Sequence, residues 1–295
     1  IVLNACTAMI ETCREAMCTS SPVRDVLSTS IRCTRQQRCG HCQSLARTSS
    51  DSGAGARARI GLLVLESDQT MEDEARALTA VVDGVALYHA RLANDVVVTP
   101  ETLANMENEL PIAAGLIPEY MGLSAIGYGC TSGSTIIGED RVAAIMNGAH
   151  PGIPTSNPLT AAKAALTQLG VLRPALLTPY TPDVTLAMQA NFSAAGLTVN
   201  LIGSFYEDSD LVVGRISPDS ILEAIIDVGS SDDCDSVFVS CTSLRAADII
   251  EAAEAAIGKP VTASNHALVW HLMRLSGVDD LIQNRGRLYR EGLSA

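Results

Sequence analysis

The sequence predicts an α/β protein with two pseudo-symmetric, flavodoxin-like lobes, each a mostly parallel sheet covered by helices. Three observations support this fold class. Short apolar runs alternate with amphipathic stretches from residue 59 onward. Several features of the first half recur in the same order in the second half. Each half also carries one Cys-Thr-Ser turn after an apolar run, at 130–132 and at 241–243. We expect the functional site in the cleft between the lobes.

The first half begins with a strand, a loop and a helix. "RIGLLVL" at 59–65 is typical of a buried strand, "ESDQT" is a polar loop, and "MEDEARALTAVV" at 71–82 is amphipathic. "AIGYG" at 125–129 predicts a further buried strand that leads directly into Cys130. This order of elements indicates one βα unit followed by the strand that carries the first Cys-Thr-Ser turn.

The second half contains the same kinds of segment. Buried-strand patterns occur at "PALLTP" (174–179), "TVNLIG" (198–203) and "SVFVS" (236–240). Helical patterns such as "RAADIIEAAEAAI" at 245–257 follow them. Strands that alternate with helices favour a parallel sheet, because parallel neighbours need a crossover connection.

The two halves are interpreted as a duplication, because three landmarks recur at nearly constant spacing. The apolar run at 59 matches the run at 173, and the two Cys-Thr-Ser turns are 111 residues apart. Asn157 and Asn265, in similar Ser-Asn segments, are 108 residues apart. The alternative is that all βα units look alike, but the shared Cys-Thr-Ser and Ser-Asn segments disfavour it. We expect lobes at 59–172 and 173–295, with the C-terminal helix packing back on the first lobe.

Residues 1–58 differ from the rest of the chain. Six of the nine cysteines lie in the first 42 residues, no apolar period is visible, and the segment ends near the Ser-, Gly-, Ala- and Arg-rich "RTSSDSGAGARAR". Three interpretations stay open: a disordered or non-native extension, a targeting segment, or a metal site. The candidate metal ligands are Cys33, Cys39, His41 and Cys42.

Composition and motifs disfavour several function classes. A net charge of −13 argues against a nucleic-acid partner, and no stretch has the roughly 20 apolar residues of a membrane span. Few cysteines follow residue 58, and such sparse use fits a cytoplasmic protein, because cytosolic thiols stay reduced. No GxGxxG follows a strand, no Walker motif is present, and the only lysines are Lys163 and Lys259. The histidines after residue 58 lack the spacing of metal ligands. We therefore expect neither a cofactor nor a metal.

The two Cys-Thr-Ser turns are the strongest candidates for chemistry. Ligands of parallel sheets bind beyond the carboxyl ends of the strands, where both turns fall. The amides after each cysteine would point at an anion and lower the thiol pKa, so each half is expected to offer a thiolate beside a carboxylate cradle. One buried cysteine is usually inert packing, but two in matching turns indicate that Cys130 and Cys241 share one substrate.

These segments resemble the aspartate/glutamate racemase superfamily. The resemblance rests on the paired Cys-Thr-Ser turns, the opening "RIGLLVLESDQTMEDE", the "TPYTPD" segment and the closing "ASNHALVWHLMRLSGV". Within the superfamily, the layout is most similar to the branch of maleate cis-trans isomerase, arylmalonate decarboxylase and the ectoine-utilisation proteins. The resemblance covers about residues 59 to 290 and implies an enzyme that works without a cofactor.

The resemblance also implies a set of site residues. Cys130 and Cys241 fall on the two catalytic cysteines of the superfamily. The other candidates are expected to bind a small carboxylate substrate. The two asparagines are included because they recur in loops at strand ends. They are Asp68, Thr131, Ser132, Asn157, Tyr180, Asp210, Thr242 and Asn265.

Some positions depart from the known members. Asp68 and Asp210 stand at or near positions where maleate isomerase is expected to have asparagine. A carboxylate only accepts hydrogen bonds and would repel a second substrate carboxylate, so both positions suit an ammonium, an amide N–H or a hydroxyl. Either residue could instead cap a loop. Cys130 departs from arylmalonate decarboxylase, where the resemblance implies glycine and a single thiol.

The sequence therefore favours a cofactor-independent racemase or isomerase of a small carboxylate, amino-acid-like or N-acylated. One thiolate would remove the proton next to the carboxylate, and the other thiol would deliver a proton to the opposite face. Three alternatives stay open: maleate cis-trans isomerisation by thiolate addition, decarboxylation of a malonate-type diacid, and a non-catalytic two-lobed binding protein. The Ala-, Val- and Leu-rich helices would suit a homo-oligomer.

Overall fold

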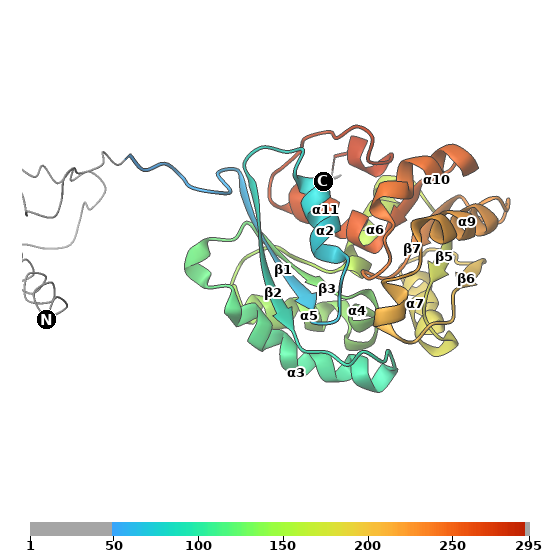
Figure 1. The fold of residues 1–295 in the computed structure, drawn as a ribbon, viewed down its shortest axis with the longest axis horizontal. Helices are drawn as coiled ribbons and strands as arrows, with labels where there is room; N and C mark the ends of the chain where they lie inside the picture. Colours follow the sequence, from blue (N-terminus) through green and yellow to red (C-terminus); the bar gives the residue numbers. More distant parts are fainter. Residues whose placement is uncertain (1–48, 293–295) are drawn as a thin grey trace, which may run out of the picture. The chain divides into compact units, whose positions relative to one another are not determined.

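The computed structural model describes residues 49–292. The prediction for Cys33, Cys39, His41 and Cys42 lies outside these residues. In the described part, two four-stranded sheets follow one another along the chain, and every paired strand runs parallel to its neighbour (Figure 1). The predicted fold class, two α/β lobes with parallel sheets and covering helices, is confirmed.

The first sheet has the strand order β2-β1-β3-β4. Its strands are β1 (Ala58–Leu65), β2 (Val85–Leu92), β3 (Ala125–Gly129) and β4 (Thr155–Ser156). The helices of this half are α2 (Met71–Thr79), α3 (Pro100–Leu116), η1 (Glu119–Met121), α4 (Thr131–Ile137), α5 (Glu139–Ala149) and α6 (Pro158–Gln168). The sequence did not predict β2, because His89 and Arg91 interrupt its apolar residues at the edge of the sheet.

The second sheet has the equivalent order β6-β5-β7-β8. Its strands are β5 (Pro174–Thr178), β6 (Ile202–Ser204), β7 (Ser236–Val239) and β8 (Val261–Ala263). The helices of this half are α7 (Pro182–Ala194), α8 (Asp210–Val213), α9 (Pro218–Gly229), η2 (Ala247–Ile249), α10 (Ile250–Ile257), α11 (Ser264–Leu275) and η3 (Leu288–Arg290). Because the two sheets share one topology, each Cys-Thr-Ser turn follows the corresponding strand, β3 or β7.

Several helices start at a polar cap followed by proline. Thr99, Asn157 and Ser217 accept hydrogen bonds from the first-turn amides of α3, α6 and α9, and proline is the next residue in each case. Such pairs favour a helix start, because the cap satisfies free N–H groups and proline has no N–H to leave unpaired. These local signals determine the residue at which each of the three helices begins.

The first sheet is buried on both faces. Ile60, Leu62 and Val64 pack with α2 and α11, whereas Leu63 and Leu65 pack with α3 and α5, as alternation along a strand requires. Figure 1 shows α2 and α11 on one side of this sheet and α3 on the other. Burial on both faces explains the continuous apolar run of β1.

Helix α11 belongs to the second half of the sequence but packs against the first half. It contacts α6, α2, β1 and β3, and every residue from Ser264 to Arg274 is buried. At the start of α2, Met71 packs so closely on β3 that a Cβ at Gly129 would overlap its Sδ. The contacts of α11 therefore join the second half of the chain to the first. None of the described helices is long and apolar enough to cross a membrane.

Candidate active site

Cys130 sits at the carboxyl end of β3 and caps helix α4. Its Sγ accepts a hydrogen bond from the Gly133 N–H at 3.2 Å and lies 3.6 Å from Ser132 Oγ. A Cβ at position 133 would lie 3.0 Å from this sulfur and 2.5 Å from Tyr128 Oη. Glycine at 133 therefore leaves the space that the thiol and the phenol occupy.

Cys241 follows β7 after one intervening residue and has an unusual backbone. Its φ is 115°, a region that L-residues other than glycine rarely adopt. Its N–H donates to Ser264 Oγ at 3.0 Å, and the same hydroxyl lies 2.7 Å from Thr131 Oγ1. Ser264 therefore joins the two cysteine loops to each other.

Replacing Cys241 by glycine is expected to stabilise the fold relative to Cys241→Ala. Glycine removes the strain at φ 115° but costs some backbone entropy, so we expect a gain of about 1 kcal/mol in the free energy of unfolding. Urea titrations of both variants measure it. The matched control is Cys130, whose φ is −148°, and there glycine should be the less stable variant. The same ranking at both positions would contradict backbone strain at Cys241.

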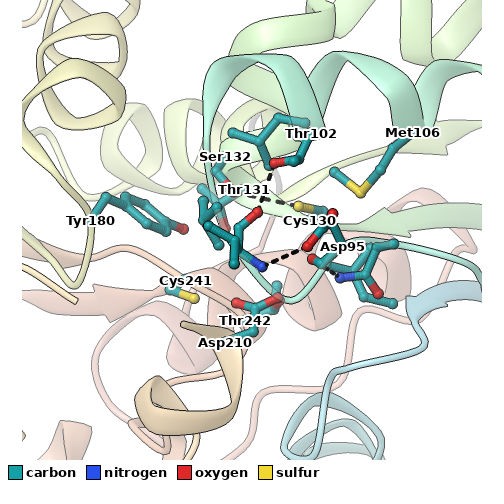
Figure 2. Close-up of a pocket in the computed structure, with 15 residues that line it drawn as sticks. Asp95, Thr102, Met106, Cys130, Thr131, Ser132, Tyr180, Asp210, Cys241 and Thr242 are labelled. Carbon is teal, nitrogen blue, oxygen red and sulfur yellow. Dashed lines mark hydrogen bonds between the residues drawn. The ribbon is translucent and has the colours of Figure 1, made fainter. Parts of the chain in front are cut away.

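Both cysteines line one small cavity between the lobes (Figure 2). Its volume is about 10 Å³, room for about one water molecule. Four of the lining residues are predicted carboxylate ligands, and a fifth is Asp210. The complete lining is Leu65, Asn94, Asp95, Val97, Val98, Thr102, Leu103, Met106, Cys130, Thr131, Ser132, Tyr180, Asp210, Cys241 and Thr242.

Two loops, one from each lobe, close the cavity. Loop 93–99 follows β2, and loop 205–209 follows β6. Val98 N–H donates to the Asp208 carbonyl at 2.8 Å, Asp210 N–H donates to the Val96 carbonyl at 3.1 Å, and Val97 pairs antiparallel with Ser209. These backbone hydrogen bonds link the lobes on the loop side of the cavity.

The predicted carboxylate ligands differ in what they can offer. The Thr131 hydroxyl is bound to Ser264, and the Thr242 hydroxyl donates to the Gly129 carbonyl at 3.3 Å. Tyr180 follows β5 in a loop fixed by Ser204, which donates to the Tyr180 carbonyl at 2.7 Å. Its hydroxyl points into the group of residues drawn in Figure 2. Hydroxyl donors are therefore left at Tyr180 and Ser132, and the two threonines can contribute backbone N–H groups.

Asp210 and Asp68 form the acidic end of the site. Asp210 Oδ2 accepts from the Ser67 hydroxyl at 2.8 Å, and burial raises the Asp210 pKa to about 6. Asp68 Oδ1 accepts from the N–H groups of Thr70 and Met71 at 2.7 and 2.8 Å, so it caps α2. Its Oδ2 is buried without a hydrogen bond in the described part of the chain. Burial also raises the Asp68 pKa.

The expectation that the amides after each cysteine lower the thiol pKa is not met in this arrangement. Burial raises the pKa of the Cys130 thiol to about 11, although the Ser132 hydroxyl and the Gly133 N–H oppose the rise. Burial, and next the Asp210 carboxylate, raise the pKa of Cys241 well above its ordinary value. The loss of water around the sulfur outweighs the favourable amides at the start of α4. At neutral pH both thiols are protonated.

The two asparagines do not occupy equivalent positions. Asn157 caps α6, where its Oδ1 accepts from Leu159 and Thr160 N–H groups at 3.0 Å, and it does not line the cysteine cavity. Asn265 lies one residue inside α11 and donates from Nδ2 to the Thr242 carbonyl at 2.7 Å. It therefore supports the Cys241 loop from behind.

Sequence reasoning missed three residues that hold the site together. Ser264 bridges the cysteine loops, while Ser67 and Asn94 form a chain to Asp210, because Asn94 Nδ2 donates to Ser67 Oγ at 2.9 Å. The only signal was proximity in sequence, since Ser67 precedes Asp68 and Ser264 precedes Asn265. Within residues 49–292, no group of three or more His, Cys, Asp or Glu side chains could hold a metal ion.

The fold and the cavity together define a class of protein: a two-lobed α/β enzyme in which each lobe supplies one buried cysteine to a shared polar site. Residues 62–289 match the sequence profile of the arylmalonate decarboxylase family. The chain belongs to this family. The resemblance to the branch of maleate isomerase and arylmalonate decarboxylase, within the aspartate/glutamate racemase superfamily, is confirmed.

Individual relatives agree with this assignment. The maleate isomerase of Alcaligenes faecalis is 24% identical over 243 residues, which are 78% of this chain and 95% of that protein. The maleate isomerase of Pseudomonas putida S16, solved with maleate, has a TM-score of 0.72 and 22% identity, covering 79% of this chain and 97% of that one. A Nocardia farcinica maleate cis-trans isomerase mutant with a covalently bound succinylcysteine intermediate has a TM-score of 0.72 and 24% identity, covering 79% and 98%. The chain is therefore an enzyme of the isomerase and decarboxylase class.

Proposed function

We propose that this chain is a cofactor-independent isomerase that transfers a proton between the two faces of the carbon next to a small carboxylate. The observation that carries the proposal is that Cys130 and Cys241, from different lobes, line one small cavity. A single buried thiol would be compatible with packing alone, but two thiols beside one small polar cavity suit proton transfer at both faces of a bound carbon.

The reaction needs only the two thiols and the carboxylate site. One cysteine, as the thiolate, takes the proton from the α-carbon and becomes a thiol, and the electron pair of the C–H bond moves into the adjacent carboxylate as an enediolate. The opposite thiol then gives its proton to the other face and becomes the thiolate. A thiolate whose thiol has a pKa of about 11 is a strong base, although at pH 8 only about one Cys130 in a thousand is ionised.

Hydrogen-bond donors around the cavity support the carboxylate part of this proposal. Tyr180, Ser132, Thr131 and Thr242 line the same cavity as the two sulfurs, and they carry hydroxyl and backbone N–H donors. Donors placed before the reaction stabilise charge as it develops, at little cost in reorganisation. These donors would therefore lower the free energy of the enediolate relative to the bound carboxylate.

The acidic end of the site supports a substrate that carries an ammonium, an amide N–H or a hydroxyl. The residues that line the cavity include no arginine and no lysine, but they include Asp210, with Asp68 close behind. The Asp210 charge disfavours both thiolates. A positive group beside Asp210 would cancel this effect, whereas a second carboxylate would add to it. We therefore favour an amino acid or an N-acylated amino acid.

The test is proton NMR of the purified chain in D₂O with a panel of small carboxylates. The panel holds aspartate, glutamate, N-acetylated diamino acids, maleate and an arylmalonate. We expect the α-proton signal of an amino or acylamino acid to disappear as deuterium enters and the opposite enantiomer to form. The double variant Cys130→Ala/Cys241→Ala is the control for background exchange. If the panel gives fumarate from maleate and no α-exchange, the racemase proposal is refuted.

Maleate cis-trans isomerisation is the second candidate. It is favoured by the maleate isomerase relative that matches 78% of this chain, and by the succinylcysteine found in a structural neighbour. In that reaction one thiolate would add to the double bond, the single bond would rotate, and the thiolate would leave. Asp210, which lines the cavity, and Asp68, which interacts with it, argue against this reaction because their charges would repel a second carboxylate. Decarboxylation of a malonate-type acid, the activity in the family name, needs only one proton donor and leaves one thiol unexplained.

A further inference from the structure

The carboxylate of Glu74 lies behind the loop that carries Cys241. Glu74 is in α2 of the first lobe, whereas the loop belongs to the second lobe. Its Oε1 accepts a hydrogen bond from the Ala247 N–H at 2.8 Å, and its Oε2 accepts from Asn265 Nδ2 at 2.8 Å. Asn265 Nδ2 also donates to the Thr242 carbonyl at 2.7 Å. One carboxylate therefore fixes both the start and the end of the loop.

A second anchor comes from the same part of the first lobe. The Thr70 hydroxyl donates to the Ser243 carbonyl at 2.8 Å. Thr70 immediately precedes α2, and Glu74 is four residues further on, so both side chains emerge on one side of the helix. Since the backbone of Cys241 is strained at φ 115°, its geometry depends on support from such neighbours.

We propose that Glu74 is a positioning residue for Cys241: its carboxylate holds the thiol loop of the opposite lobe in place, and the loop loosens when that carboxylate is neutralised. The inference rests on the proposed function, because it takes Cys241 to be one of the two reacting thiols. Glu74 does not line the cysteine cavity and acts only through Asn265 and the backbone.

The ionisation of Glu74 supports this role. Burial raises the Glu74 pKa to about 7, and its hydrogen bonds to Ala247 and Asn265 oppose the rise. Above pH 7 the carboxylate accepts both N–H groups, whereas below it the protonated oxygen is a donor and gives one of them up. The charged and titratable groups that act on or near Glu74 are few. Asp248 raises its pKa further and Tyr289 lies within electrostatic reach, while Asp73 and Arg245 line the same surface groove and Arg285 bonds the Ala77 carbonyl of the same helix.

The test compares the reactivity of the two thiols in one sample. The full chain, its Glu74→Gln variant and the control Asp73→Asn are treated with iodoacetamide from pH 6 to 9, and labelling is quantified per peptide by mass spectrometry. Asp73 is a matched control because it lies on the same helix and its side chain is 80% exposed. The ratio of Cys241 to Cys130 labelling cancels the shared rise in thiolate with pH.

In the unmodified chain we expect this ratio to fall as the pH rises through about 7. In Glu74→Gln the ratio at pH 8 should rise on the order of tenfold and lose its pH dependence, as the loss of a hydrogen bond to a charged group predicts. Asp73→Asn should match the unmodified chain. Hydrogen–deuterium exchange of the peptide 241–249 is the second measurement, because the Ala247 N–H bonds Glu74 directly.

A ratio within twofold of the unmodified chain, together with unchanged exchange in 241–249, would overturn the inference. If labelling of the buried thiols is too slow to measure, the exchange measurement decides alone. Neither measurement needs a substrate. Failure of the D₂O panel would therefore refute the proposed function without touching the role of Glu74, and an unchanged ratio would refute that role without touching the reaction.

Discussion

Replacing the thiol side chain by a methyl group, in Cys130→Ala or Cys241→Ala, is expected to lower racemisation about 10²- to 10⁴-fold. Each thiol acts as a general acid or base at one face, and a positioned group of this kind contributes about 10² to 10⁴ in rate. Neither thiol can reach both faces, because they come from opposite lobes of one small cavity. The loss is measured as the initial rate of enantiomer formation on the substrate that the D₂O panel identifies.

The single variants should also differ in a way that assigns each thiol to a face. The remaining cysteine can still remove a proton on its own side and return one there. We therefore expect each variant to exchange the α-proton of one enantiomer without inverting it, with opposite enantiomers for the two variants. Cys234→Ala is the control, since that thiol is buried against the Val228, Gly229 and Ser231 carbonyls, away from the cavity. Near-normal racemisation in either site variant would rule out two-thiol transfer.

Asp210→Asn is expected to stabilise the fold at neutral and higher pH. The folded-state pKa of Asp210 is raised from 3.8 to about 6, so the folded protein binds more protons than the unfolded chain between these values. Stability contributed by this group is therefore present at low pH and is lost as the pH rises from about 4 to about 6. The loss amounts to about 3 kcal/mol. The asparagine variant has no charge to bury and can still accept from Ser67.

Urea unfolding of both proteins from pH 4 to pH 8 measures this effect. Glu74, whose pKa is also raised, contributes the same slope to both proteins, so the difference between the curves reports Asp210 together with its charge interaction with Asp68. We expect the curves to converge near pH 4 and to separate by about 1 to 3 kcal/mol above pH 6. Asp208→Asn is a matched control, because Asp208 is exposed and two residues away. Parallel curves would mean that Asp210 is not the buried charge inferred here.

The positions of the two cysteine turns were predictable from the sequence pattern, whereas Tyr180 and Asp210 were expected only because of the family resemblance. Ligand-binding loops of parallel sheets follow the carboxyl ends of strands, and buried strands are recognised in the sequence as apolar runs. Glu74 and Ser264 were not predictable, because their roles depend on partners 173 and 133 residues away in the chain. Such contacts arise only when α2 and α11 pack against each other on the first sheet, which local patterns do not encode.

The internal repeat predicted the sheets well but not the loops that carry the site residues. It correctly predicted two sheets of one topology, but it treated Cys130 and Cys241 as equivalent. Cys130 is an extended residue that caps a helix, whereas Cys241 sits in a strained turn with φ 115°. The asparagine match failed for the same reason, since Asn157 caps its helix and Asn265 lies inside the next one. Duplicated strands keep their pairing, but the loops between them are free to diverge.

The two loops that close the cavity bind each other through main-chain groups at Val96, Val98 and Asp208. Main-chain hydrogen bonds need no particular side chain, so sequence can change at these loops without opening the site. The substrate specificity of the site and the contact between its two loops can therefore evolve independently in this architecture. That independence offers a physical route by which one scaffold acquires new substrates through a few substitutions at the acidic end, and it makes the side chains of loop 93–99 the natural positions for directed evolution.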